Sequence, residues 1–367
     1  MKEHTACIRE RNNDHDAPAI APGAAAIPHR KVIRSWMAEI ASTSTPRALA
    51  LVALDLVLLV LTSAATILVA SSVLKVLTAC AMGLVISRLF ILGHDACHQS
   101  LTRHRPLNRW LGRLMFLPSL TPYSLWEAGH NVVHHGYTNL RGFDFVWQPL
   151  SIDEFNALPP RRQWLERVYR SGWAPWAYYG IEIWWKRMFF PNRATMSTRR
   201  AVFFWDSVLV SAFAVLWIGG LAAAAVVTQQ SIAWLIVVGF ALPLTVWSGM
   251  IGFVVYVHHT HRGVAWYADK KAWSASQPFV STTVHLTFRC ALGTVLHHIM
   301  EHTAHHVDMS VPLYRLQRAQ ALLEAKMPGS IVVQPFSWSW YAQTARCCKL
   351  YDFDKGRWTD FAGRPSP

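Results

Sequence analysis

The sequence is poor in charged residues. Only 15% of its 367 residues are charged, against roughly 25% in a typical soluble protein, while 52% are hydrophobic. This composition excludes a disordered chain, which needs few apolar residues and a high charge density. It also argues against an ordinary soluble enzyme, whose surface needs more charge. We therefore expect one membrane-embedded body with polar flanks, although length alone suggests two or three soluble domains.

Several recognisable motifs are absent. The six cysteines show no paired CxxC spacing, so neither a zinc ribbon nor an iron–sulfur framework is predicted. The sequence has no HExxH motif, which argues against a zinc protease. The first 46 residues contain no short apolar core before a small-residue cleavage site. We expect them to form a polar cytoplasmic tail rather than a cleaved signal peptide.

Acidic residues are outnumbered by basic ones, 21 against 35, which gives a formal net charge of +14. Such an excess suits either nucleic acid or an anionic membrane surface. The sequence has no basic motif interleaved with aromatic residues, so we expect no nucleic acid partner. Most of the basic residues lie between the apolar stretches and at the two ends of the chain, which indicates membrane topology.

Four stretches are long and apolar enough to cross a bilayer, which requires about 20 residues of helix. The predicted spans are about 47–70, 72–93, 202–227 and 232–257. Very short, uncharged linkers join the spans in pairs, so each pair is predicted to form a hairpin. Because Lys and Arg favour the cytoplasmic face, both termini and the central segment are predicted to be cytoplasmic.

The predicted fold is an all-α integral membrane protein with four transmembrane helices in two hairpins and a cytoplasmic helical cap. Residues 1–46 would form the N-terminal tail, residues 47–330 the membrane domain, and residues 331–367 a cytoplasmic C-terminal tail. An unpaired Asp55 in the first span would cost about 2.5–3.5 kcal/mol at a helix centre. We expect its carboxylate to lie near the interface or to be paired within the bundle.

Histidine is the most informative residue type. Fifteen of the 18 histidines follow residue 90, and most lie in four groups: HDACH at 94–98, HNVVHH at 130–135, HHTH at 258–261 and HHIMEHTAHH at 297–306. Spacings of three and four residues place side chains on one face of a helix. Because two hairpins return the chain to one side of the membrane, all four groups can converge there.

Converging imidazoles indicate a metal site, since imidazole binds zinc, copper, iron and nickel. Eight or nine ligands exceed one four-coordinate site, so two metal ions are expected. A haem held by paired histidines within the spans is disfavoured because the spans contain no histidine. A carboxylate-bridged di-iron bundle needs Glu-x-x-His twice, and only Glu127 with His130 has this spacing.

These residues resemble the integral-membrane fatty acid desaturase and hydroxylase family, whose three histidine boxes bind a non-haem di-iron centre. HDACH is similar to the first box, HNVVHH to the second, and HTAHH at 302–306 to the third. The flanking residues GHNVVHHGYTN and HHVDMSVPLYRL resemble bacterial acyl-lipid desaturases of the Δ12 or ω-6 type. YVHHTH at 256–261 is similar to a segment that carries one further ligand, in register with His259. The resemblance covers roughly residues 50–330.

The resemblance implies an O2-dependent oxidoreductase that introduces a cis double bond into a fatty acyl chain. The acyl chain would be carried on lipid, coenzyme A or acyl carrier protein, in the inner (plasma) membrane of a bacterium. The implied cofactor is two iron ions, with O2 as co-substrate. A hydroxylase, an acetylenase or a carotenoid-modifying oxygenase on the same scaffold is the alternative. Because no His-Pro-Gly-Gly haem motif occurs, electrons would come from a separate protein, with ferredoxin as the expected class.

The resemblance also implies a ligand set and no catalytic residue beyond the metal centre. The implied metal ligands are His94, His98, His130, His134, His135, His259, His302, His305 and His306. Residues expected to fix imidazole tautomers by hydrogen bonding are Asp95, Asn131, Asp144 and Asp308.

Overall fold

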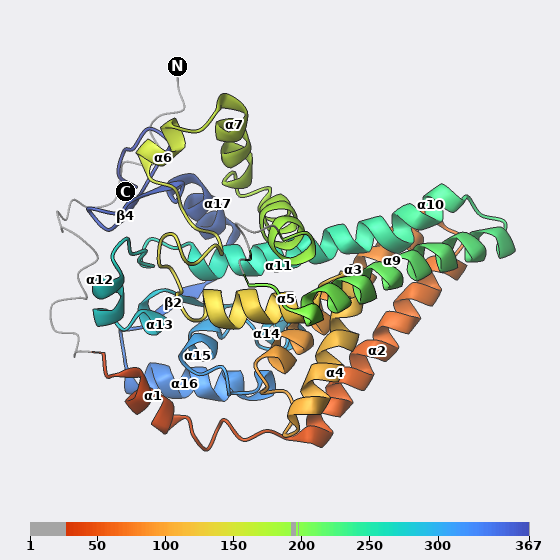
Figure 1. Ribbon diagram of the computed structural model, residues 1–367, viewed down its shortest axis with the longest axis horizontal. Helices are drawn as coiled ribbons and strands as arrows, with labels where there is room; N and C mark the ends of the chain where they lie inside the picture. The colour runs from red at the N-terminus through yellow and green to blue at the C-terminus, as the bar shows by residue number, and fades with distance from the viewer. Residues whose placement is uncertain (1–26, 192–195, 197, 367) are drawn as a thin grey trace.

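The computed structural model describes residues 27–191, 196 and 198–366 (Figure 1). The described chain is mostly helical, as predicted, and four helical stretches are long and apolar enough to cross a membrane. These stretches are α2 (Thr45–Leu68), α3 (Ser72–Cys97), α9 (Ala201–Val227), and the continuous run of α10 (Ile232–Ile236), η4 (Val237–Ala241) and α11 (Leu242–His259). The long helices extend to the right of Figure 1, and the shorter elements gather at the left.

Local sequence explains where these helices begin and where one of them widens. Pro46 stands in the first turn of α2, where its missing N–H costs nothing. The Ser71 side chain caps α3 by accepting a hydrogen bond from the backbone N–H of Leu74. Pro243 cannot donate a backbone hydrogen bond, and the turn that precedes it is the π-helical η4.

α2 and α3 form an antiparallel pair joined by a three-residue connection. Thr66 and Thr78 hydrogen-bond at 3.0 Å near the connection, and Asp55 pairs with Arg88 at 2.7 Å further along. α3 also packs against α11 and α4 (Arg105–Phe116), so it is the central helix of the four. α2 and α9 expose large apolar side chains, such as Val60 at 66% and Leu216 at 74%. Exposed apolar faces of this extent suit contact with lipid.

The remaining elements form the compact left part of Figure 1. The helices among them are α1 (Arg30–Trp36), η1 (Leu117–Ser119), α5 (Tyr123–Glu127), η2 (Ala128–His134), α6 (Ile152–Asn156), α7 (Pro160–Tyr169), α8 (Pro175–Tyr178), η3 (Tyr179–Phe189), α12 (Lys270–Ala275), α13 (Pro278–Ser281), α14 (Leu292–Val295), α15 (His302–Val307), η5 (Leu313–Arg315), α16 (Leu316–Lys326) and α17 (Trp338–Cys347).

Two small sheets were not anticipated from the sequence. β1 (Val284–Thr287) pairs in parallel with β2 (Val332–Pro335), with Val284 opposite Val332. β3 (Leu350–Asp352) pairs antiparallel with β4 (Arg357–Thr359). Three of these strands lie after residue 330, so the segment predicted as a C-terminal tail is folded through residue 366 against the rest of the protein. Of the predicted N-terminal tail, residues 1–26 lie outside the described residues, and α1 occupies part of the remainder.

An aromatic core lies where α3, α4, α5 and α11 meet. The Phe90 ring on α3 stacks on Phe116 with centroids 4.9 Å apart, and it meets Trp126 and Trp247 edge-on at 5.5 and 5.6 Å. All four side chains are buried. Aromatic pairs in such geometries stabilise a core beyond their buried area. This core fixes the end of α3 relative to α5 and α11. His94 and His259 lie on α3 and α11, and His130 follows α5.

Candidate metal centre

Four elements bring the predicted histidines together from distant parts of the chain. The last turn of α3 carries His94, with His98 at its C-cap, and η2 carries His130 and His134, with His135 directly after it. The end of α11 carries His259. α15 carries His302, His305 and His306 on its short helix. The nine residues divide into two groups whose ring nitrogens lie within 4.8 Å of one another.

The first group has five histidines whose Nε2 atoms lie close together. The Nε2 atom of His130 is 3.0 Å from that of His94 and 3.0 Å from that of His135. His305 approaches His135 at 3.0 Å, and His98 approaches His94 at 3.4 Å. The members of this group are His94, His98, His130, His135 and His305.

The second group has four histidines and is buried throughout. The Nε2 atoms of His302 and His259 lie 3.3 Å apart, and those of His306 and His302 lie 3.1 Å apart. His134 completes the group. Its ring centroid lies 4.8 Å from that of His259 and 4.9 Å from that of His306.

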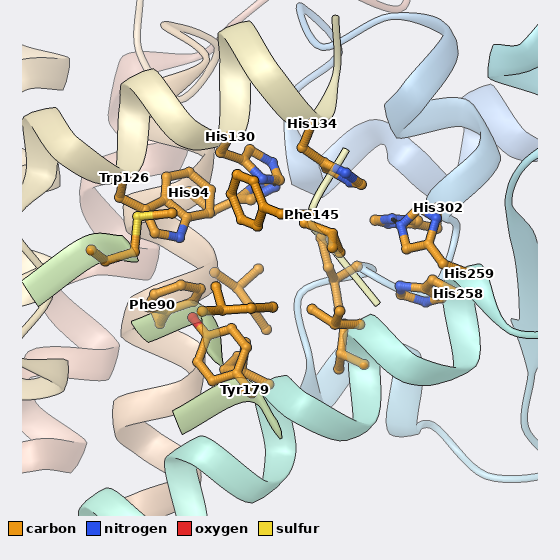
Figure 2. Close-up of a pocket in the computed structure, with 18 residues that line it drawn as sticks. Phe90, His94, Trp126, His130, His134, Phe145, Tyr179, His258, His259 and His302 are labelled. Atoms are coloured by element: carbon orange, nitrogen blue, oxygen red, sulfur yellow. Dashed lines mark hydrogen bonds between the residues drawn. The ribbon is translucent and has the colours of Figure 1, made fainter. Parts of the chain in front are cut away.

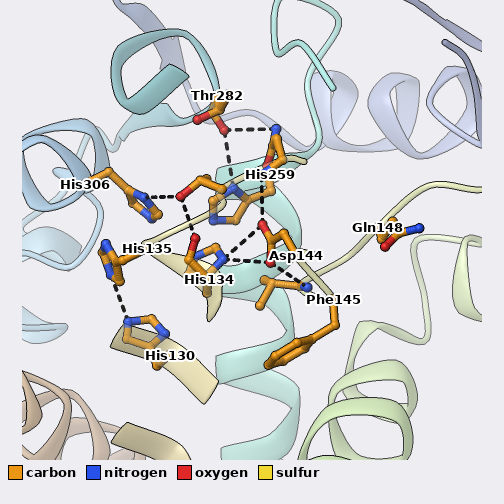
Figure 3. Close-up of polar contacts among 12 residues, drawn as sticks. His130, His134, His135, Asp144, Phe145, Gln148, His259, Thr282 and His306 are labelled. Atoms are coloured by element: carbon orange, nitrogen blue, oxygen red, sulfur yellow. Dashed lines mark hydrogen bonds and ion pairs between the residues drawn. The ribbon is translucent and has the colours of Figure 1, made fainter. Parts of the chain in front are cut away.

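Hydrogen bonds on the far side of three rings aim the second group inward (Figure 3). His134 Nδ1 lies 3.0 and 3.1 Å from the two carboxylate oxygens of Asp144, so this nitrogen donates. His259 Nδ1 lies 3.3 Å from the Thr282 carbonyl oxygen, which can only accept. His306 Nδ1 lies 3.2 Å from the Thr138 hydroxyl. A proton on Nδ1 leaves the lone pair on Nε2, the atom that faces the other rings.

Asp144 is itself held rigidly. Its side chain is fully buried, and it accepts hydrogen bonds from the backbone N–H groups of Asn139 at 2.9 Å and Val146 at 3.0 Å. These bonds fix the carboxylate before it meets His134. Asp144 thus combines a fixed orientation with a negative charge beside the second group.

The other three residues expected to orient imidazoles bond elsewhere. Asp95 accepts from the backbone N–H of Leu313 at 2.9 Å. The Asn131 amide donates to the Cys97 carbonyl at 2.8 Å. Asp308 pairs with Arg34 at 2.9 Å. These contacts tie together the backbone segments around the centre.

Burial together keeps six histidines of the two groups neutral at pH 7. Removal from water, followed by repulsion between neighbouring imidazoles, lowers the pKa of these six below the ordinary value of 6.5. The pKa of His305 falls to about 3. The pKa is likewise lowered at His98, His130, His135, His302 and His306. Neutral imidazoles keep a free lone pair, which is the form that binds a metal.

The donor set fits two metal cations. Clustered neutral imidazoles with facing Nε2 atoms cannot all hydrogen-bond to one another, because a proton is needed at each contact and each ring offers one. Within the described residues, the Nδ1 atoms of His94, His98, His135, His302 and His305 have no hydrogen-bond partner. One cation in each group would satisfy the converging lone pairs.

Several residues at the centre were missed by sequence reasoning. Trp126 stacks on His130 with ring centroids 4.1 Å apart, and its spacing of four residues on a helix could have indicated this. Thr138 follows His134 by the same spacing. Thr282 has no sequence signal, because it meets His259 only through the tertiary fold. His258 stacks on His302 at 3.9 Å and lies outside both groups.

A buried ion cluster supports the chain just before α15. Asp55 on α2 is fully buried and binds both Arg88 on α3 and the Nε2 atom of His297 at 2.6 Å. Arg88 also donates to the Val295 carbonyl. Asp55 is thus paired within the bundle, one of its two expected positions. The cluster joins α2 and α3 to the loop that leads to His302, and this loop has left-handed backbone at both His297 and His298.

An apolar cavity opens beside both histidine groups (Figure 2). Its volume is about 70 Å³, so it is narrow. His94, His130, His134, His259 and His302 contribute to one wall. The other walls are mainly apolar and include Phe90, Ile91, Tyr179, Ile183, Met188, Ile251 and Val254. A slender apolar ligand in this cavity would lie against ring nitrogens of both groups.

The fold and the centre define a helical membrane protein with two adjacent histidine sites beside an apolar cavity. The sequence model of the family named "Fatty acid desaturase" matches residues 70–338. The chain belongs to this family, and it is an oxidoreductase, as the histidine boxes predicted.

Several characterised relatives are similar over most of their length. The sn-1 oleoyl-lipid 12-desaturase of Synechocystis sp. is 26% identical over 274 residues, which is 75% of each chain. The protein of the same name from Arthrospira platensis is 28% identical over 262 residues, or 70% of each chain. The sn-1 acyl-lipid omega-3 desaturase (ferredoxin) of Synechocystis sp. is 27% identical over 238 residues, which is 63% of this chain and 62% of that one. The predicted likeness to acyl-lipid desaturases of the Δ12 or ω-6 type is confirmed.

Proposed function

We propose that the protein is an O2-dependent membrane desaturase that introduces a cis double bond into a lipid-bound acyl chain. The observation that carries this proposal is the placement of two adjacent groups of five and four histidines beside one narrow apolar cavity, which members of both groups line. The names of the cyanobacterial relatives support an acyl-lipid substrate. The relative named with ferredoxin supports a separate iron–sulfur protein as the electron donor.

The proposed cofactor is a pair of iron ions with O2 as co-substrate, and these supply the oxidation of unactivated C–H bonds that no side chain can perform. The proposed ligands are His94, His98, His130, His135 and His305 for one ion, and His134, His259, His302 and His306 for the other. Neutral imidazoles suit divalent iron. Asp144, Thr282 and Thr138 would keep three Nε2 lone pairs directed at the second ion.

The cavity residues would bind and orient the acyl chain. Phe90, Ile251 and Val254 offer only carbon to the ligand, so burial of methylene groups there would be favourable by about 0.8 kcal/mol each. The same apolar walls exclude water from the reacting carbons. The described surface of α2 and α9 supports a location in the membrane. We further propose that the protein lies in the plasma membrane of a bacterium and that residues 47–330 form its membrane domain. The metal centre would then lie on the cytoplasmic side of the membrane.

The proposal is tested by expression in a bacterial host whose lipids lack polyunsaturated chains. Gas chromatography with mass spectrometry of the host lipids should reveal a new double bond, and the purified protein should contain about two irons per chain. His305→Ala should abolish the product and lower the iron content. His104→Ala, at an exposed histidine outside both groups, is the matched control and should retain both. An iron-free wild-type protein, or a hydroxylated product in place of an alkene, would contradict the proposal.

A further inference from the structure

A second depression reaches the centre and shares no lining residue with the apolar cavity. This basic cleft has a volume of about 370 Å³ and lies between α1 and the α12–α13 segment. It is lined by Arg30, Lys31, Arg34, Trp273, Phe279 and, at the centre, His135. The apolar cavity touches neither His135 nor α1. The histidine groups therefore have two separate approaches, one apolar and one polar.

The basic cleft carries an excess of positive charge. Among the described residues that line it there is no carboxylate. Arg34 is partly neutralised by Asp308 at 2.9 Å, while the guanidinium of Arg30 spends its hydrogen bonds on the neutral carbonyls of His306 and Val307. Lys31 is exposed. Such a surface attracts and orients an acidic partner.

Short hydrogen-bonded paths connect the wall of the cleft to the second histidine group. The indole N–H of Trp273 donates to the Thr138 carbonyl at 2.8 Å, and the Thr138 hydroxyl lies 3.2 Å from His306 Nδ1. Arg30 donates to the backbone carbonyl of His306 at 2.8 Å. His135, a member of the first group, lines the cleft itself. An electron arriving at Trp273 or His135 would thus have only one or two contacts to cross.

The position of the cleft favours a water-soluble partner over a lipid headgroup. In Figure 1, α12 and α13 lie at the left end of the molecule, opposite the connection between α9 and α10 at the right. The apolar helices extend away from this end. A soluble protein can approach the left end without entering the membrane.

We propose that the basic cleft is the docking site of an acidic protein that carries one electron, and that electrons enter the centre beside Trp273 and His135. This inference rests on the proposed function. Each desaturation would oxidise two carriers by one electron each. These two electrons, the two electrons and two protons of the broken C–H bonds, and two protons from solvent reduce O2 to two waters. The carrier gives up only electrons, so its contact surface needs no substrate channel.

Charge reversal at Lys31 tests the docking site by a binding measurement. Biolayer interferometry with a plant-type [2Fe–2S] ferredoxin should show a Kd for Lys31→Glu that is roughly three- to tenfold higher than that of the wild type at low salt. The difference should be smaller at high salt. The matched control is Arg161→Glu, an exposed residue of α7, the helix at the top of Figure 1 and remote from α1. Its Kd should equal that of the wild type.

Trp273→Phe tests the electron entry point. This variant keeps an aromatic ring in the cleft but removes the N–H group that binds Thr138. Its Kd for ferredoxin should be near the wild-type value, while the rate at which it oxidises reduced ferredoxin in stopped flow should fall severalfold. A rate equal to that of the wild type would move the entry point elsewhere.

The outcomes separate this inference from the proposed function. An equal Kd for Lys31→Glu and wild type overturns the docking site. The docking site is also overturned if Lys31→Glu loses binding to vesicles containing anionic phosphatidylglycerol but keeps its binding to ferredoxin. That result would assign the cleft to lipid headgroups. Wild-type protein supplied with dithionite tests desaturation without any carrier. If no double bond forms there, the proposed function fails, while the ferredoxin Kd values still decide the role of the cleft.

Discussion

At the scale of single residues, the two histidine groups differ in how their rings are held. Three of the four rings in the second group have an Nδ1 partner, and one of these partners is the charged Asp144. In the first group, the Nδ1 atoms of His94, His98, His135 and His305 have no partner among the described residues. The second group is therefore the better oriented of the two, and its orientation depends most strongly on Asp144.

Asp144→Asn should lower the affinity of the second group for its metal. The amide loses the negative charge and can turn its NH2 group toward His134, so we expect a loss of about 10- to 100-fold in metal affinity. Iron per chain, measured by mass spectrometry after dialysis against a weak chelator, should fall from about two toward one. Asp153→Asn on α6, at an exposed aspartate, is the control and should keep both iron ions. Full iron retention in Asp144→Asn would contradict this role.

The neutral histidines also predict how the metal-free protein responds to acid. Six of them have a pKa that is near 6.5 in the unfolded chain and lowered in the folded one, to about 3 for His305; the others are His98, His130, His135, His302 and His306. Below pH 6.5 the unfolded chain takes up protons that the folded chain does not. Each such histidine therefore costs about 1.4 kcal/mol of stability per pH unit, and the loss continues until the folded pKa is reached.

Thermal unfolding of metal-free protein in detergent should follow this dependence. Tm should fall steadily from pH 7 to pH 5, and His305→Gln should show a shallower fall. Iron-loaded protein should resist acid further, because a bound metal competes with the proton for each Nε2. A Tm of the metal-free protein that is constant over this range would refute the neutral, buried state of the rings.

At the scale of elements, the contact between α11 and α8 sets one wall of the apolar cavity. The backbone of Gly252 on α11 lies against that of Pro175, and a Cβ atom at Gly252 would lie 2.7 Å from the Pro175 carbonyl carbon. α8 continues into η3, which carries Tyr179 and Ile183 into the cavity. The close approach of two backbones therefore determines the width of the cavity.

Gly252→Ala should force α8 away from α11. We expect a loss of stability of about 1–3 kcal/mol from overpacking, together with lower product formation. Gly219 on α9 is the matched control, since a Cβ atom there meets nothing within 4 Å. Gly219→Ala should be neutral or stabilising by about 0.5–1 kcal/mol. Unfolding in detergent followed by tryptophan fluorescence measures both, and equal effects of the two changes would disprove the close contact.

The elements also show what the sequence could predict. Spacings of three and four residues identify His302, His305 and His306 as one face, because a helix is local. Hydropathy likewise locates the four long helices. α3 differs from its predicted span chiefly by continuing into the HDACH motif as far as Cys97. The partners of those histidines were less accessible. Asp144 was one of four candidates, and the tertiary fold alone distinguishes it from Asp95, Asn131 and Asp308.

At the scale of the whole molecule, the C-terminal segment completes the structure around the centre. β2 pairs with β1, and His285 of β1 forms a bridge with Glu301 directly before α15. Trp358 on β4 donates through its indole N–H to the His261 carbonyl at 2.9 Å, two residues beyond His259. Two of the segments that carry the clustered histidines are thus supported by residues after position 330. Composition alone gave no sign of this, since the contacts join positions far apart in the chain.

Removal of residues 331–367 should therefore damage the centre rather than trim a free end. We expect less folded protein and an iron content below half that of the full chain, because β1 loses its pairing partner and the chain after α11 loses Trp358. Size-exclusion chromatography in detergent and iron analysis measure both effects. Lys355→Ala, at an exposed position between β3 and β4, is the control and should change neither the amount of folded protein nor its iron content. A truncated protein with normal iron content would show that this support is dispensable.

The wide separation of the histidines along the chain has a consequence for biosynthesis. When a ribosome has released the chain only through His135, directly after η2, the nascent chain offers four members of the first group but only His134 of the second. His302, His305 and His306 emerge more than 200 residues after His94, and only then can the His306 carbonyl receive Arg30. If each group holds one metal ion, as proposed, loading of both must wait until synthesis is nearly finished. The unfinished chain would thereby lack a completed metal pair while its apolar cavity is still open to water.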